Sequence, residues 1–272
     1  MVTIPSFSDL SKRHDWLIAN KLQMIAQKTA TIKLADEVCT PFHFLMTLGN
    51  DASKSDAQTA LKDATKIKVV SVINTTKLFD SHGDVHIDGL WNKSLKENKQ
   101  NYLVKEHAFN FDGIISDNVK ASAVDMTWKD LGYDYAGKTQ ALVYTSEIDA
   151  ADKTGMFDRY KANKVSQHSV GMRYVKLQLA IDNKKYADEY KAWKDYYDMI
   201  VNKSEVDAAG YFWAVTEAKN IEGSAVLRGS NYVTPTISVQ ESKDEPGKPT
   251  QTEPLKTLRF PESKSILSNL KF

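Results

Sequence analysis

The 272-residue sequence contains only one cysteine, Cys39, and has almost no excess of charge of either sign. A single cysteine excludes an internal disulfide and a zinc cluster built from cysteine thiolates. The formal net charge is +1, so overall charge gives no reason to expect nucleic acid or an anionic membrane as a partner. The function therefore has to be sought in local motifs.

Long apolar runs are also missing. No run approaches the roughly 20 residues needed to cross a bilayer, and the first residues, MVTIPSFSDLSKRHDW, lack the apolar centre of a secretion signal. These absences predict an intracellular protein. The composition is 42% hydrophobic and 10% aromatic, which is enough for a folded core.

The hydrophobic pattern predicts a mixed α+β fold dominated by strands. Helical spacing of apolar residues indicates helices at 8–27 and 183–201. Tyr186, Tyr190, Trp193 and Tyr197 form an aromatic stripe on the second helix, which we expect to pack inside the fold. Stretches rich in β-branched and alternating apolar residues predict strands within 66–80, 140–148, 165–182 and 211–239.

Composition divides the chain into three parts. Residues 1–65 are expected to be an N-terminal helical extension, and residues 66–239 the main domain, with a helical insertion near 183–201. Residues 240–272 begin with the polar, proline-bearing stretch ESKDEPGKPTQTEP, which is typical of a flexible linker. The last residues regain apolar side chains and are expected to form a docking tail.

The stretch DSHGDVHIDGLW, Asp80 to Trp91, holds four alternating metal-ligand side chains: His82, Asp84, His86 and Asp88. Histidine and carboxylate suit zinc or iron. On a strand the four would lie at intervals of about 6.5 Å on one face, so a single ion gathers them only if the chain bends. A metal site is one of three interpretations.

The second interpretation is a phosphotransferase. HGDVHID is similar to the HGDxHxxN signature of aminoglycoside and choline kinase-like enzymes, in which Asp84 would be the catalytic base. The sequence lacks a glycine-rich phosphate loop upstream. The third interpretation is a structural turn built by Asp80, Gly83, Asp84 and Gly89, in which His82 and His86 take no part.

A second constellation suggests nucleophilic catalysis, which needs a hydroxyl or thiol and a base within reach. In KVSQHSVGMRYV, Ser169 begins a strand and Gly171 follows two residues later, where a small residue lets backbone N–H groups approach an oxyanion. His168 is expected to point to the opposite face of the strand. His107, in LVKEHAFNF, is the alternative base.

The order of these motifs resembles the HK97-type prohead maturation protease family of tailed bacteriophages, related in fold to herpesvirus assemblin. FDSHGDVHIDGLW is similar to the opening motif of that family, and LVKEHAFN to its strand-end histidine. SVGM is similar to its nucleophile motif, and KNIEGSAVLRGSNYVTPTISV to its last strand. The resemblance covers residues 66–239. It departs from the family at Met172, at Trp91 and at Arg228-Gly229-Ser230.

The resemblance implies an antiparallel, β-barrel-like core with peripheral helices and a serine endopeptidase activity. Ser169 would be the nucleophile, His107 the base and Glu222 the residue that orients it, with Glu217 as the alternative to Glu222. No cofactor or metal is implied. The implied partners are scaffold and major capsid proteins, and further copies of the chain, inside the assembling prohead in the host cytoplasm. A non-catalytic virion or assembly protein of the same fold is the alternative function.

Overall fold

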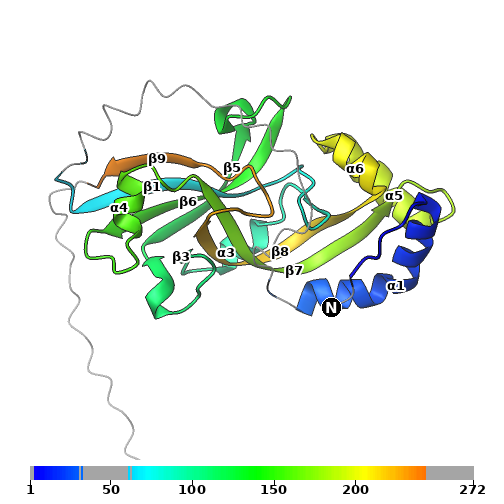
Figure 1. Ribbon diagram of the computed structural model, residues 1–272, viewed down its shortest axis with the longest axis horizontal. Helices are drawn as coiled ribbons and strands as arrows, with labels where there is room; N and C mark the ends of the chain where they lie inside the picture. The colour runs from blue at the N-terminus through cyan, green and yellow to red at the C-terminus, as the bar shows by residue number, and fades with distance from the viewer. Residues whose placement is uncertain (1–2, 31, 33–60, 62, 243–272) are drawn as a thin grey trace, which may run out of the picture. The chain divides into compact units, whose positions relative to one another are not determined.

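A computed structural model describes residues 3–30, 32, 61 and 63–242 of the chain (Figure 1). Its α-helices are α1 (Leu10–Ala30), α3 (Asn92–Glu97), α4 (Met156–Lys161), α5 (Ala187–Tyr196) and α6 (Lys203–Ala209). Three short 3-10 helices are η2 (Phe111–Gly113), η3 (Lys129–Leu131) and η4 (Tyr197–Met199). Of the linker and tail predicted at 240–272, residues 240 and 241 belong to strand β9 (Thr236–Glu241), and Cys39 and residues 243–272 lie outside the described residues. None of the described helices is long and apolar enough to span a membrane.

The strands form two sheets. The first has the order β5-β6-β1-β9, from β5 (Val119–Thr127), β6 (Lys138–Asp149), β1 (Lys66–Thr75) and β9 (Thr236–Glu241), and all its pairs are antiparallel. The second is built on β8 (Tyr211–Val226). Its other members are β2 (Asp84–His86), β3 (Leu103–Lys105), β4 (Ile114–Ser116) and β7 (Gln167–Ile181).

In the second sheet, β8 is antiparallel to β7 and parallel to both β2 and β3. The predicted α+β class is confirmed. Antiparallel pairing prevails among the described strands, as predicted, and the parallel pairs that β2 and β3 make with β8 are the exceptions. The described strands form no closed barrel.

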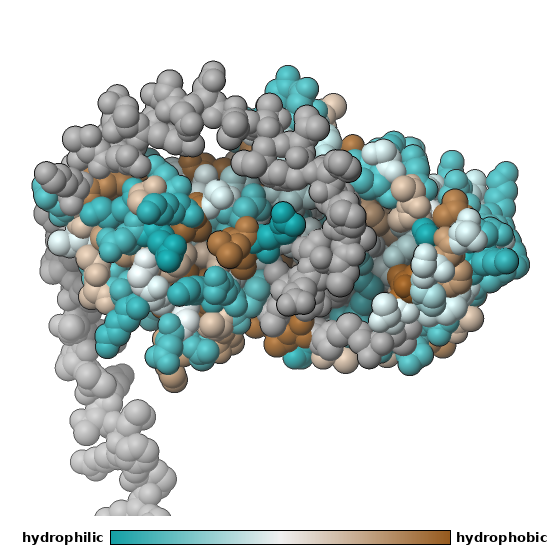
Figure 2. All heavy atoms as spheres, viewed as in Figure 1, coloured by the Kyte–Doolittle hydropathy of each residue, from teal (hydrophilic) through white to brown (hydrophobic). Residues whose placement is uncertain are grey.

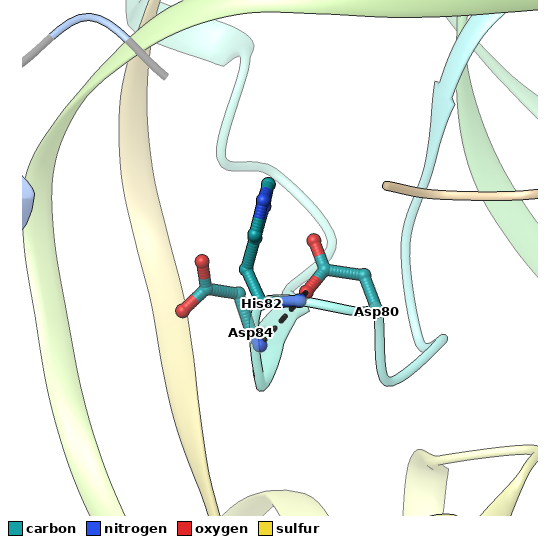
Figure 3. Close-up of side chains that lie close together, drawn as sticks. All are labelled: Asp80, His82 and Asp84. Carbon is teal, nitrogen blue, oxygen red and sulfur yellow. Dashed lines mark hydrogen bonds between the residues drawn. The ribbon is translucent and has the colours of Figure 1, made fainter. Parts of the chain in front are cut away.

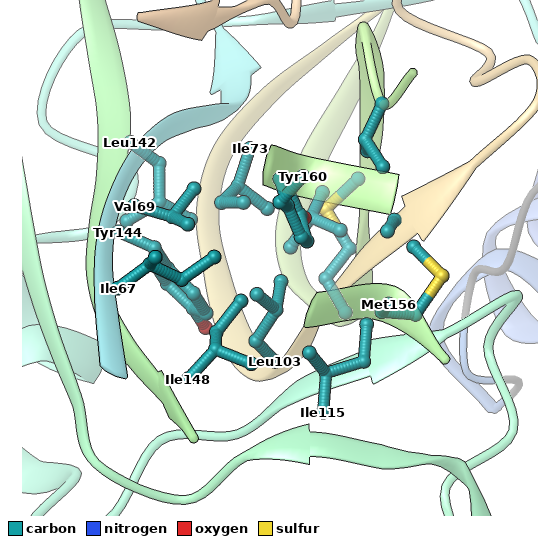
Figure 4. Packing of buried hydrophobic residues seen from close by; sticks show 14 of the residues in the cluster. Ile67, Val69, Ile73, Leu103, Ile115, Leu142, Tyr144, Ile148, Met156 and Tyr160 are labelled. Carbon is teal, nitrogen blue, oxygen red and sulfur yellow. The ribbon is translucent and has the colours of Figure 1, made fainter. Parts of the chain in front are cut away.

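The main hydrophobic core fills the space between β1, β6 and the β7–β8 pair (Figure 4). Ile67, Val69 and Ile73 contribute from β1, and Leu142 and Tyr144 contribute from β6; all five are buried. Alternate residues of a strand share one face, so these positions present a continuous apolar surface. Burying a large apolar side chain stabilises a fold by about 1.5–3 kcal/mol, so this cluster holds the two sheets together.

The predicted N-terminal helix is α1. Asp9 accepts the N–H of Ser11 at 2.7 Å and so caps it. Leu17 and Met24 on its inner face join a cluster with Leu179, Ile181 and Trp213 of β7 and β8. The helix therefore packs directly on the second sheet.

The helix predicted at 183–201 is α5 followed by η4. Its aromatic stripe is packed, as expected: Trp193 is buried and lies against Phe212 and Tyr197. The short helices α3 and α4 begin three residues after Gly89 and directly after Gly155. On the face drawn in Figure 2, hydrophobic residues are interspersed among hydrophilic ones.

Candidate active site

Glu222 lies on β8, between β7, which carries Ser169, and β3, which leads to His107. On one edge, Ser224 of β8 is in register with Val104 of β3, and on the other edge with Ser169 of β7. Glu222 is in register with Gly171 of β7, and a bulge follows this pair because Met172 pairs with Asn220. Bulges bend a strand and re-aim its side chains, and they are common beside active sites.

His107 lies in a strained turn that follows β3. Glu106 and His107 both have left-handed backbone conformations, with φ of 49° and 57°. Such conformations cost of order 1–3 kcal/mol in residues other than glycine and persist only when the surroundings hold them. Here the His107 N–H donates to Ser224 Oγ at 2.8 Å, and the Glu106 N–H donates to the Ala225 carbonyl at 2.9 Å.

The imidazole of His107 contacts the carboxylate of Glu222. His107 Nδ1 lies 2.6 Å from Glu222 Oε1, and both side chains are nearly enclosed, at 7% and 1% exposure. Burial raises the pKa of Glu222 above its usual range, while the hydrogen bond and positive charge of His107 oppose that rise. A carboxylate on Nδ1 fixes the ring orientation and leaves Nε2 as the nitrogen for proton transfer.

Gly171 makes room for this carboxylate. A Cβ at position 171 would lie 2.2 Å from Glu222 Oε1 and 2.8 Å from its Cδ, closer than atoms can approach. Any larger residue would displace the carboxylate from its place beside His107. The sequence pattern associated Gly171 with an oxyanion, whereas the contact that requires a glycine here is with Glu222.

Ser169 lies on the same face of the sheet as Glu222. Its strand partner is Ser224, and the side chains of directly opposed residues share a face. A side chain at Gly171 would point at Glu222. Because residues two apart on a strand share a face, Ser169 also lies on the face that bears Glu222. Ser169 is 6% exposed, and no hydrogen bond joins its hydroxyl to the ring of His107 among the described contacts.

The loop after β8 approaches Ser169 closely. A Cβ on Gly229 would lie 2.7 Å from the His168 carbonyl oxygen and 3.5 Å from Ser169 Cβ. Only a glycine lets the main chain pass at this distance. The Arg228-Gly229-Ser230 segment, which departs from the family pattern, thus brings backbone groups beside the candidate nucleophile.

His168 points to the other face, as expected from its position next to Ser169. Its Nε2 lies 2.9 Å from the Tyr160 hydroxyl and its Nδ1 lies 3.1 Å from the Thr234 carbonyl oxygen. Full burial lowers the pKa of His168 to about 4, against the opposing effect of the hydrogen bond to Thr234. His168 is therefore a neutral structural histidine at pH 7.

His168 makes stability sensitive to acid. Its pKa of about 4 is below the unfolded value of 6.5, so the unfolded chain takes up the proton first as pH falls. The contribution of neutral His168 to the free energy of unfolding is fully present above about pH 6.5. About 3 kcal/mol of this free energy is lost between pH 7 and pH 4. Urea unfolding at a series of pH values should show a shallower acid slope for His168→Gln. The same replacement at partly exposed His82 should keep the wild-type slope, and equal slopes in all three proteins would contradict this assignment.

Glu217, the alternative orienting residue, is engaged elsewhere. It lies 2.6 Å from Lys176 Nζ and 3.4 Å from Lys93 Nζ. The hydrogen bond from Lys176 lowers the pKa of Glu217. The structure thus places Glu222, and not Glu217, against His107.

The alternating His/Asp stretch forms a buried turn at a different part of β8. Asp80, His82 and Asp84 offer ligand atoms within 4.8 Å of one another (Figure 3). Asp80 Oδ1 accepts the N–H groups of His82 and Asp84 at 2.9 and 3.0 Å, and Gly83 has a φ of 74°. This is the turn that the structural interpretation predicts.

Both oxygens of Asp84 are occupied by protein groups. Lys28 Nζ of α1 contacts Oδ1, and the Tyr174 hydroxyl donates to Oδ2 at 2.7 Å. The ammonium of Lys28 therefore stands where a cation would bind. Burial, and then the charge of Asp84, raise the pKa of Tyr174 well above its usual value.

His86 lies outside this turn and has contacts of its own. His86 is 1% exposed, and its Nδ1 lies 2.9 Å from Asn74 Nδ2 while its Nε2 lies 3.3 Å from the Tyr174 hydroxyl. His86 belongs to the buried polar network around Asp84. Its ring centroid lies 6.0 Å from that of Tyr174 and 6.5 Å from that of Trp91, so aromatic side chains surround it.

Sequence reasoning gave no role to three residues that shape these sites: Ser224, Lys28 and Tyr174. Ser224 is two residues from Glu222 on the same strand, which was a signal available in the sequence. Lys28 and Tyr174 carried no such signal, because only the packing of α1 on β7 brings them to Asp84.

None of the family models, curated proteins or solved structures compared with the chain matches it.

Proposed function

We propose that the chain is a serine endopeptidase with Ser169 as nucleophile, His107 as general base and Glu222 as the residue that orients His107. The observation that carries this proposal is the 2.6 Å contact between His107 Nδ1 and buried Glu222 Oε1, on the sheet face that also bears Ser169. Acyl transfer requires a histidine that is held by a carboxylate and can reach a serine, and the first of these two contacts is present here. The strained backbone at His107 also supports a functional role.

In the proposed reaction Ser169 Oγ attacks the carbonyl carbon of a peptide bond while His107 Nε2 accepts the hydroxyl proton. The same proton passes to the nitrogen of the departing amine as the C–N bond breaks, leaving an ester on Ser169. Water then attacks this ester, His107 takes a proton from the water, and the serine is released with its proton restored. Glu222 keeps a proton on Nδ1 and stabilises the imidazolium that forms in each step.

Substrate binding is expected to complete this arrangement. Among the contacts of the described residues none joins the Ser169 hydroxyl to the His107 ring, and catalytic hydrogen bonds of this kind often tighten only when substrate binds. The main chain at Gly229 passes close to Ser169, since a Cβ there would lie 3.5 Å from Ser169 Cβ. We expect its N–H groups to stabilise the oxyanion, a contribution worth about 10²–10³ in kcat when one donor is lost.

The order of motifs supports a role in phage head maturation. The site residues occur in the order that the prohead maturation protease family shows, and the two-sheet α+β fold is compatible with an open form of the assemblin-like architecture. The proposed substrates are scaffold and major capsid proteins within the assembling head, in the host cytoplasm.

Co-expression with the capsid and scaffold proteins of the neighbouring genes tests this proposal. Wild-type protein should produce shortened capsid or scaffold chains, and Ser169→Ala should leave them intact. Ser166→Ala is the matched control, because exposed Ser166 lies three residues away just before β7. Equal processing by wild type and Ser169→Ala would refute the nucleophile assignment. Intact chains in both would favour the non-catalytic assembly protein.

A further inference from the structure

Two loops that flank the candidate catalytic residues carry exposed aromatic and aliphatic side chains. Phe111 is 95% exposed and Leu227 is 92% exposed, which makes them the most exposed large apolar residues of the described chain. Phe109, between His107 and Phe111, is 54% exposed. Isolated apolar residues on a surface are ordinary, but apolar residues gathered beside a site indicate a contact surface.

Strand direction brings the two loops to the same end of the sheet. β3 and β8 are parallel, with Lys105 in register with Ala225, so the chain leaves both strands in the same direction. Phe109 and Phe111 follow β3, and Leu227 follows β8. Val226, the residue before Leu227, is in register with Gln167, two residues before Ser169.

The loop that carries Phe111 is ordered. Asn110 Oδ1 accepts the Gly113 N–H at 2.9 Å, and a Cβ on Gly113 would lie 2.0 Å from the Ala108 carbonyl oxygen. The loop is thus folded back tightly on Ala108, and Phe109 packs edge-on against Tyr102 at 5.6 Å between ring centroids. The fold holds the Phe111 ring in solvent next to the turn of His107, although an apolar side chain in water gives no stability by itself.

We propose that Phe109, Phe111 and Leu227 are specificity-determining residues that bind large apolar side chains of an extended peptide on either side of the bond cleaved at Ser169. This inference rests on the proposed function and adds the class of substrate. Its basis is the position of all three residues in the two loops next to His107 and Ser169. An extended segment crossing this end of the sheet would cover the exposed rings and transfer their apolar surface out of water.

A mixture of synthetic peptides of varied sequence, analysed by mass spectrometry, tests this inference on the full chain. Wild type should cleave next to leucine, phenylalanine or methionine. The double variant Phe111→Ser/Leu227→Ser should raise KM for the best apolar peptide roughly tenfold or more, with kcat changed less, as expected for lost apolar contacts. Leu22→Ser is the matched control, because Leu22 is 80% exposed on α1 and carries no role in catalysis.

Labelling with a small fluorophosphonate separates this inference from the proposed function, because the probe reacts with an activated serine without needing peptide contacts. Wild type and the double variant should be labelled at equal rates. Two outcomes would overturn the inference and leave the serine assignment intact, provided that Ser169 is labelled. In one, the double variant keeps the cleavage profile of wild type. In the other, wild type does not cleave apolar peptides. Absence of labelling in wild type would overturn both.

Discussion

Replacing His107 by asparagine is expected to lower kcat for peptide hydrolysis about a million-fold, the loss typical of removing the base of a serine–histidine pair. Asparagine suits this test because it tolerates the left-handed backbone that residue 107 adopts, with φ of 57°. Its amide can also approach Glu222, so the turn after β3 should survive. The measurement is the single-turnover rate on a cleaved peptide, together with urea unfolding.

Glu222→Gln separates orientation from proton transfer. An amide at this position no longer fixes the imidazole in the productive tautomer, and a loss of about 10⁴ in kcat is expected. KM should change little, because Glu222 is 1% exposed and is not placed to touch substrate.

A His107→Asn protein that is folded and retains more than a few percent of wild-type activity would contradict the role given to His107.

Replacing Lys28 by methionine is expected to destabilise the fold by about 3–5 kcal/mol, because it removes the ammonium that contacts the buried carboxylate of Asp84. Asp84 is fully buried, and the Lys28 side chain is 12% exposed. The ammonium also lies 5.5 Å from the Trp213 ring and 6.0 Å from the Tyr174 ring, which adds cation–π attraction. The free energy of unfolding from urea titration at pH 7 measures the loss.

Two further variants make this prediction specific. Lys185→Met breaks the exposed pair with Asp15 of α1, in which the two side chains are 62% and 54% exposed, and should destabilise the fold far less than Lys28→Met, because exposed ion pairs contribute little to stability. Lys28→Met/Asp84→Asn removes both charges and should recover most of the stability, because a neutral pair avoids the penalty of a buried charge. If Lys28→Met unfolded at the same urea concentration as Lys185→Met, the buried ion pair would have no special role.

The elements that sequence reasoning located are those with a strong periodic signal. The alternation of Val175, Leu177, Leu179 and Ile181 identified β7, and the aromatic spacing after residue 183 identified α5. The parallel pairing of β2 and β3 with β8 could not be predicted, because both strands are three residues long. Strands this short carry no pattern that encodes direction.

The candidate site was predictable residue by residue but not in its contacts. The motif order indicated His107, Ser169 and Glu222, yet it left Glu217 as the alternative to Glu222. Only the strand register decides between the two carboxylates, since it places Glu222 opposite Gly171 and leaves Glu217 among lysines. The roles of Lys28 and Tyr174 depend on tertiary packing, which a local pattern does not contain.

The central claim is that Ser169 is an activated nucleophile, and covalent labelling measures this directly. Purified full-length protein is incubated with a fluorophosphonate, and the adduct is located by mass spectrometry of proteolytic peptides. The proposed site predicts one adduct per chain, on Ser169, which is absent from Ser169→Ala and forms far more slowly in His107→Asn. A folded wild-type chain that remains unlabelled, or an adduct on a different residue, would contradict the claim.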